Sequence, residues 1–208
     1  MSYIRSINVR KEWDKVESLD LIIFGKFERQ TFSSELKIIG KEFQNTLRIA
    51  EELGDMEGKI GESNLFYSNG LRILIIGLGK KDELNTQIAR NVAGKISRIA
   101  VEKKLKNISI ECFSSSHEIC QAIGEGLVLG SYQFLEHKTN KKEKFDIDQV
   151  NLIGGDKESL NKGIEIGKAV CFGRDLSNHP GNITTPTRLA EVAKEISDEG
   201  SISCVVFD

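Results

Sequence analysis

The segment "LRILIIGLG" at residues 71–79 restricts the fold more than any other part of the chain, because Leu71–Ile76 is apolar almost throughout. A half-buried strand alternates apolar and polar residues, whereas a strand of continuous apolar residues is covered on both faces. The dipeptide Asn69-Gly70 lies between this run and the apolar run before it, which is the signature of a type I′ hairpin. The segment therefore predicts a strand inside a sheet, entered through a β-hairpin.

Strands and helices alternate along the rest of the chain. Apolar runs and period-2 patterns predict strands at 3–10, 18–25, 107–113, 147–155 and 201–207. Apolar stripes at helical spacing predict helices at 33–53, 85–104, 115–134, 158–176 and 187–199. This order predicts an α/β fold, a three-layer sandwich with a mixed, largely parallel sheet. Gly124, Gly126 and Gly130 narrow one helix where another element could approach closely.

Charge and hydropathy exclude some classes of protein. The formal net charge of −2 gives no overall attraction to nucleic acid or to an anionic membrane. The longest apolar runs are too short to span a bilayer, and we expect no membrane partner. The charged start "MSYIRSINVRKEWDK" does not resemble a secretory signal, so we expect a cytoplasmic location. One loop is rich in lysine, which favours a solvated surface and leaves a weak nucleic-acid contact open; its lysines are Lys138, Lys141, Lys142 and Lys144.

No group of residues forms a convincing active site. Gly77-Leu78-Gly79 is half of a dinucleotide-binding fingerprint, but Asp82 stands where the third glycine belongs, so a tight turn is the simpler interpretation. Glu125 and Glu136 have no partner in the pattern, and we expect both to be solvated.

The metal-ligating residue types are also scattered. The histidines have neither HxH nor HxxxH spacing, which predicts no zinc site; they are His117, His137 and His179. The cysteines show no CxxC spacing and are expected to be buried, reduced thiols; they are Cys112, Cys120, Cys171 and Cys204. We therefore predict no catalytic residue and no metal ligand in this chain.

The stretch "GRDLSNHPGNITTPTRLA" at 173–190 contains both prolines of the chain. Pro180 ends the helix that precedes it, and Thr185 with Pro186 begins the next one as cap and first-turn proline. This punctuation predicts a domain at 1–174, a linker at 175–186 and, at 187–208, the truncated start of a second domain. We expect the apolar stripe of the last helix, which includes Leu189, Val192 and Ile196, to pack back on the first domain.

The same stretch resembles the segment that leads into the catalytic domain of leucyl aminopeptidases, the cytosol aminopeptidase family. The matching positions are Arg174, Asp175, Leu176, Asn178, Pro180, Asn182, Pro186, Leu189 and Ala190. Gly181 departs from the pattern, since the family commonly has a second proline or a small residue there. Three upstream stretches are similar to the family in the same order, namely "MEGKIGE" at 56–62, "ILIIGLGKKDEL" at 73–84 and "EGLVLGSYQFLEHKTNKK" at 125–142.

The resemblance implies a macro-domain-like N-terminal domain of a hexameric enzyme that hydrolyses N-terminal residues from peptides. In that family a C-terminal catalytic domain, the partner expected here, holds two divalent metals, zinc or manganese. Its ligand motif, such as NTDAEGR, is absent from this sequence, so the chain is expected to be inactive alone and no catalytic or metal residue is carried over. The alternative function is a binding module for nucleic acid or an ADP-ribose-type ligand.

Overall fold

The computed structural model describes residues 4–13, 18–68, 70–137, 139, 144–200 and 202–207. The strands are β1 (Ile4–Arg10), β2 (Leu21–Phe27), β3 (Ser63–Ser68), β4 (Leu71–Gly79), β5 (Asn107–Glu111) and β6 (Ile147–Ile153). The α-helices are α1 (Lys41–Glu52), α2 (Thr86–Glu102), α3 (His117–Ser131), α4 (Lys157–Asn178) and α5 (Pro186–Glu199). Two short 3-10 helices, η2 (Ser34–Ile39) and η3 (Lys81–Glu83), complete the described elements.

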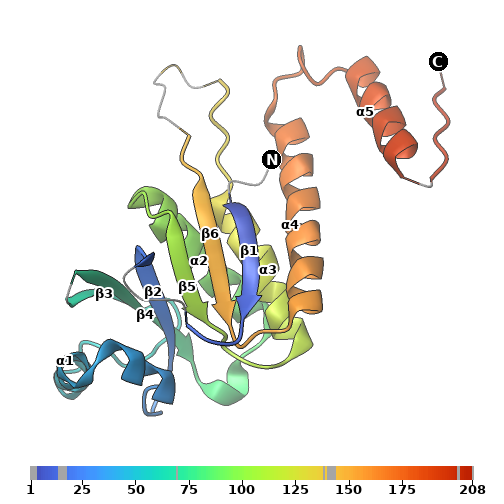
Figure 1. The fold of residues 1–208 in the computed structure, drawn as a ribbon. Coiled ribbons are helices and arrows are strands. Elements are labelled where there is room, and N and C mark those ends of the chain that lie inside the picture. The colour runs from blue at the N-terminus through green and yellow to red at the C-terminus, as the bar shows by residue number, and fades with distance from the viewer. Residues whose placement is uncertain are drawn as a thin grey trace.

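The six strands form one mixed sheet in the order β1-β6-β5-β2-β4-β3 (Figure 1). The β3–β4 pair is antiparallel and the other four pairs are parallel, which confirms the predicted largely parallel sheet. Strand β4 lies between β2 and β3, and Ile73–Ile76 are buried as the sequence predicts. Ser68 pairs with Leu71 across a two-residue hairpin, where Gly70 has a φ of 79°. Asn69 lies outside the described residues.

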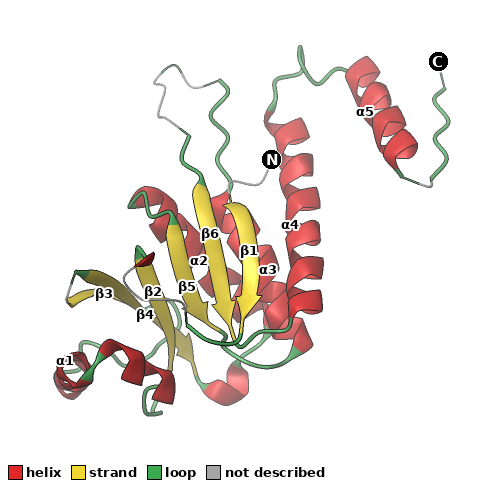
Figure 2. Ribbon diagram, viewed as in Figure 1, coloured by secondary structure: helices red, strands yellow, loops and turns green. Residues whose placement is uncertain are grey.

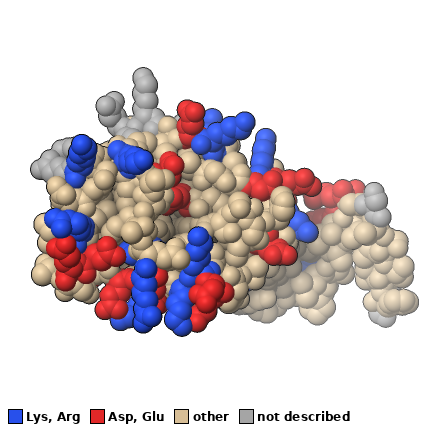
Figure 3. Space-filling model, turned by 90° about the horizontal axis from the view of Figure 1, so that it is seen from below, with Lys and Arg blue, Asp and Glu red and all other residues tan. Residues whose placement is uncertain are grey.

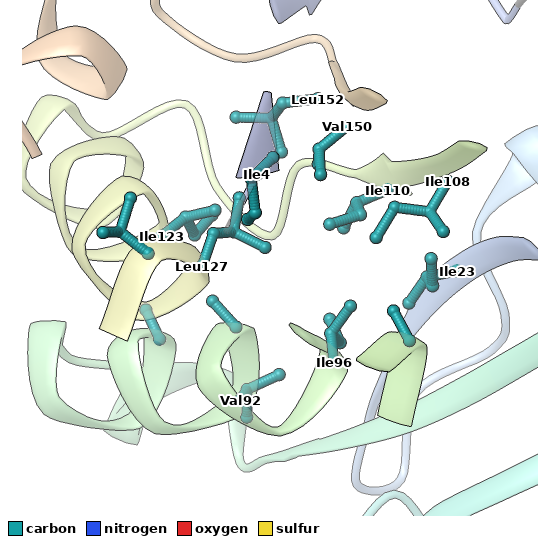
Figure 4. Close-up of a cluster of buried hydrophobic side chains, with 14 of the residues drawn as sticks. Ile4, Ile23, Val92, Ile96, Ile108, Ile110, Ile123, Leu127, Val150 and Leu152 are labelled. Carbon is teal, nitrogen blue, oxygen red and sulfur yellow. The ribbon is translucent and has the colours of Figure 1, made fainter. Parts of the chain in front are cut away.

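Helices cover both faces of the sheet (Figure 2). On one face α2, α3 and α4 enclose the larger core, part of which Figure 4 shows, with Ile96 and Ile123 facing Ile110 and Val150 of the sheet. On the other face α1 and η2 cover a smaller core built on β2 and β4. The predicted three-layer arrangement is therefore confirmed.

The second face changes from apolar to polar along one row of neighbouring residues. Asn8 pairs with Asn151, Asn151 with Ser109, Ser109 with Ile22, and Ile22 with Ile73. The apolar end of this row lies beneath α1 and η2, whereas the other end carries amide and hydroxyl groups. Helical cover on this face thus coincides with the apolar half of the sheet.

Helices α2, α3 and α4 approach one another with their backbones in contact. A β-carbon on Gly130 of α3 would lie 2.2 Å from the carbonyl oxygen of Gly94 in α2. On the opposite side of α3, a β-carbon on Gly124 would lie 2.5 Å from the carbonyl oxygen of Leu160 in α4. Only glycine permits such distances, which confirms the close approach expected of this glycine-rich helix.

Three expectations differ from the structure. The helix predicted at 33–53 is divided by Gly40, whose φ of 89° is left-handed, into η2 and α1. Residues 202–207 form no strand and are exposed, because an extended segment is stable only with a neighbouring strand to pair with. Helix α5 projects away from the sheet (Figure 1), and its apolar stripe is not covered as a whole: Leu189 and Ile196 are 45% and 43% exposed, whereas Val192 is 5% exposed.

Among the residues that the structure describes, no helix combines the length and the apolar character needed to cross a bilayer.

Candidate functional site

The side chain of Tyr132 is surrounded by residues of the family-like motif at the end of α4. Its hydroxyl donates a hydrogen bond to Asp175 Oδ1 at 2.7 Å and accepts one from Asn178 Nδ2 at 3.0 Å. The guanidinium carbon of Arg174 lies 5.6 Å from the centroid of the Tyr132 ring, in cation–π contact. Three residues of the predicted motif therefore contact Tyr132, which belongs to the family-like stretch at 125–142.

Local sequence places these groups together. Helix α3 ends at Ser131, and Tyr132 follows in an extended conformation that directs the chain away from the helix axis. Asp175 and Asn178 are three residues apart on α4 and thus share one helix face. Both lie in the last part of α4, so the first four residues of the predicted linker, 175–178, are still helical. The domain boundary itself remains a prediction.

The turn after α4 has the capping pattern that the prolines predict. The backbone N–H of His179 donates to the Asp175 carbonyl at 3.2 Å, and the Pro180 carbonyl accepts from Ile183 and Thr184. Thr185 caps α5 by accepting from the Arg188 N–H at 3.2 Å, and Pro186 is the first residue of that helix. Asn182 is exposed on this turn.

The structure brings together two histidines that the sequence separates by about forty residues. Nε2 of His137 lies 3.1 Å from Nδ1 of His179, and Nε2 of His179 lies 3.5 Å from a carboxylate oxygen of Glu136. The Phe134 ring packs against both imidazoles, with centroid distances of 5.5 and 5.2 Å. No spacing rule reveals this group, because it depends on where the segment after α3 meets the end of α4.

Glu125 is not solvated, contrary to the sequence prediction. Its side chain is 8% exposed and accepts from Nε of Arg90 in α2 at 2.6 Å and from Gln121 at 2.9 Å. The close packing of α2 on α3 explains the burial, since Glu125 adjoins the glycine positions at that contact. Glu136 is exposed, as predicted.

The glycines at the end of β4 serve packing within the domain. A β-carbon on Gly77 would lie 1.9 Å from the carbonyl oxygen of Lys59, in the stretch at 56–62. Glu62 holds that stretch by accepting from the backbone N–H groups of Glu57, Gly58 and Lys59. Gly77 also donates to the Glu62 carbonyl at 2.9 Å. Gly77 therefore serves packing inside β4, whereas Gly79, with a φ of 76°, ends the strand just before η3, as the strand-to-helix turn expected from the sequence requires.

A hollow of about 660 Å³ lies where β2, β4 and β5 end. Its lining includes Lys81, Asn85 at the start of α2, and Ser114–Ser116 at the start of α3. The carboxyl ends of parallel strands are where α/β folds bind ligands, so this is the natural location for a small ligand. Of the lysine-rich loop, Lys138, Lys141 and Lys142 lie outside the described residues.

Among solved structures, a tomato leucine aminopeptidase mutant matches with a TM-score of 0.73 and 25% identity, over 94% of this chain and 43% of that one. The bottromycin maturation enzyme BotP in complex with Mn gives a TM-score of 0.72 at 19% identity, over 91% of this chain and 38% of that one, which shows the shared fold. A probable cytosol aminopeptidase of Sulfurihydrogenibium sp. is 32% identical over 95% of this chain, which spans 42% of that relative. The family model "Cytosol aminopeptidase family, N-terminal domain" matches residues 23–141. The chain belongs to the cytosol aminopeptidase family and contains the N-terminal domain of that family.

Proposed function

We propose that this chain is the non-catalytic N-terminal part of a metal-dependent leucyl aminopeptidase. The observation that carries the proposal is the contact between Tyr132 and the motif at 174–178, because it joins two family-like stretches at the exit from the domain. In the complete enzyme, a catalytic domain with two zinc or manganese ions would follow, and the assembly would be a cytoplasmic hexamer. The metal ions would activate water and polarise the scissile carbonyl.

Exposed apolar residues support the proposal that a second domain packs against this chain. Ile166, Val170 and Phe172 on α4 are 39%, 42% and 43% exposed, and Val205 and Phe207 after α5 are 74% and 89% exposed. Exposed apolar surface of this extent is typical of an interaction site. We infer that the catalytic domain covers the side of α4 that carries Ile166 and Val170, together with α5 and the residues that follow it.

A nucleic-acid-binding function has less support. On the face shown in Figure 3, Lys and Arg side chains alternate with Asp and Glu, so no large surface of one sign is formed there. Phosphate contacts require such a basic surface and produce steep salt dependence. A gel-shift assay at low and moderate salt tests the alternative, and a salt-sensitive shift would favour it over a purely structural role.

The main proposal is tested with a fusion of this chain to the catalytic domain of the Sulfurihydrogenibium relative. With manganese, the fusion is expected to hydrolyse a leucyl chromogenic substrate, and the 208-residue chain alone is not. Val170→Asp in the fusion should reduce activity or domain cohesion, whereas Lys41→Asp, at an exposed position of α1 on the opposite face of the sheet, should not. Metal-dependent turnover by the chain alone, or equal behaviour of the two variants, contradicts the proposal.

A further inference from the structure

Three potential metal ligands meet where the segment after α3 contacts the end of α4. Glu136, His137 and His179 each offer one donor atom, and these atoms lie within 4.8 Å of one another. Two imidazoles with a carboxylate form a ligand set that Zn²⁺ accepts, with the fourth position taken by water. Neither the family resemblance nor the motif at 174–190 assigns a metal to these residues.

The distance between the two imidazole nitrogens suits a zinc ion. Two ligands at 2.0–2.1 Å from a tetrahedral zinc are separated by about 3.3 Å. Nε2 of His137 and Nδ1 of His179 are already 3.1 Å apart, close to that separation. The carboxylate of Glu136 is 68% exposed, so it can rotate toward the two nitrogens without displacing other side chains.

The surroundings hold the two imidazoles in place. Phe134 forms an apolar wall against both rings, and the His137 and His179 rings cross at 76°. His179 is the C-terminal cap of α4, fixed by its N–H bond to the Asp175 carbonyl. The carboxyl end of a helix carries partial negative charge, which favours a bound cation.

We propose that Glu136, His137 and His179 form a Zn²⁺-binding site with three protein ligands and one water. The ion joins the segment after α3 to the end of α4 and holds His179 immediately before Pro180, where the chain leaves the domain. The site differs from the two metal ions proposed for the catalytic domain, and it requires no residue outside this chain. Its presence is therefore independent of whether the complete enzyme is an aminopeptidase.

Calorimetric titration with Zn²⁺, and the visible absorption of bound Co²⁺, test the site in the tag-free chain at a pH where imidazole is neutral. The chain should bind one ion at this site. His137→Gln, His179→Gln and Glu136→Gln should each weaken binding at least about tenfold, since loss of even an outer-shell partner of a metal site has that effect. The matched control is His117→Gln, because His117 lies elsewhere, beside Ser159 and Asp156.

Circular dichroism checks that each variant is folded. His137 is exposed, so the His137→Gln variant still tests the site if His179→Gln does not fold. Hydrogen exchange gives a second measurement, in which Zn²⁺ should slow amide exchange at His179 and at residues 181–184 in the unaltered chain but not in His137→Gln. Absence of Zn²⁺ binding, or equal binding by the unaltered chain and the His137 and His179 variants, overturns the proposal.

Discussion

The hydroxyl of Tyr132 donates a 2.7 Å hydrogen bond to the carboxylate of Asp175, and this bond connects the end of α3 to the last part of α4. Asn178 donates to the same hydroxyl, so one phenol is paired with two residues of the family motif. Because His179 and Pro180 follow at once, the contact sets the direction in which the chain leaves the domain.

Tyr132→Phe should lower the free energy of unfolding by about 1.5–2 kcal/mol, because it removes a hydrogen bond to a charged group and leaves Asp175 with one partner fewer. Chemical denaturation measures the change. Tyr67→Phe is the matched control, since Tyr67 is 70% exposed. Equal effects of the two substitutions would show that the Tyr132 hydrogen bonds do not stabilise the fold.

Gly130→Ala should destabilise the domain by about 1–3 kcal/mol, because the added methyl group meets backbone that cannot yield without separating α2 from α3. Gly173→Ala on α4 serves as the comparison, since a β-carbon at Gly173 would have no neighbouring atom within 4 Å. That change should be neutral or stabilising, because alanine favours helix over glycine. Thermal and urea unfolding of both variants measure the difference, and a neutral Gly130→Ala would disprove the close-contact explanation.

Glu125→Gln should reduce stability by about 1–3 kcal/mol, because it removes the charge that compensates the partly buried Arg90. The comparison is Glu52→Gln, which breaks the exposed ion pair with Arg48 at 2.9 Å. Exposed pairs contribute little, so that change should stay within about 0.5 kcal/mol. Urea denaturation at low and high salt measures both, and a destabilisation by Glu125→Gln that largely disappears at high salt would argue that the Arg90–Glu125 ion pair is solvated.

Glu111→Gln should stabilise the protein at about pH 7 but not at about pH 3.5, where the carboxyl is protonated in both states. Burial raises the pKa of Glu111, although a hydrogen bond from Ser33 opposes the shift. The unfolded chain therefore loses this proton at lower pH than the folded protein does, and the native state is penalised above the folded pKa. Denaturation across this pH range measures the effect, with exposed Glu102→Gln as control. A pH-independent difference would exclude titration of Glu111 as its cause.

Cys204 should react with a thiol reagent well before the other three cysteines, because it is exposed, contrary to the burial expected from the sequence. The hydrogen bond with Cys112 lowers the pKa of Cys120, but Cys120 is buried, so access rather than thiolate content limits its reaction. Cys204→Ser should remove the rapid phase of labelling, whereas Cys171→Ser should leave it unchanged. A rapid phase that persists in Cys204→Ser would assign it to another thiol.

The predictions made from the sequence agree best with the structure where they depend only on neighbouring residues. The continuous apolar run at Ile73–Ile76 identifies a strand covered on both faces, and the prolines locate the end of α4 and the start of α5. The strand expected at 201–207 fails because pairing is not a local property, and residues 202–207 have no neighbouring strand among the described residues. The exposure expected for Glu125 fails for a similar reason, since Arg90, which pairs with it, lies on another helix.

The sequence by itself determined the order of the elements, the largely parallel sheet, and the motif that relates the chain to cytosol aminopeptidases. These follow from residue periodicity, turn chemistry and short motifs, which act over a few neighbouring residues. Only the tertiary structure decided that Tyr132 contacts Asp175 and that His137 lies beside His179. The physical reason is that both contacts depend on how α3 and α4 pack. Close backbone contacts at glycines set that packing between residues far apart in the sequence, which local sequence patterns do not relate to one another.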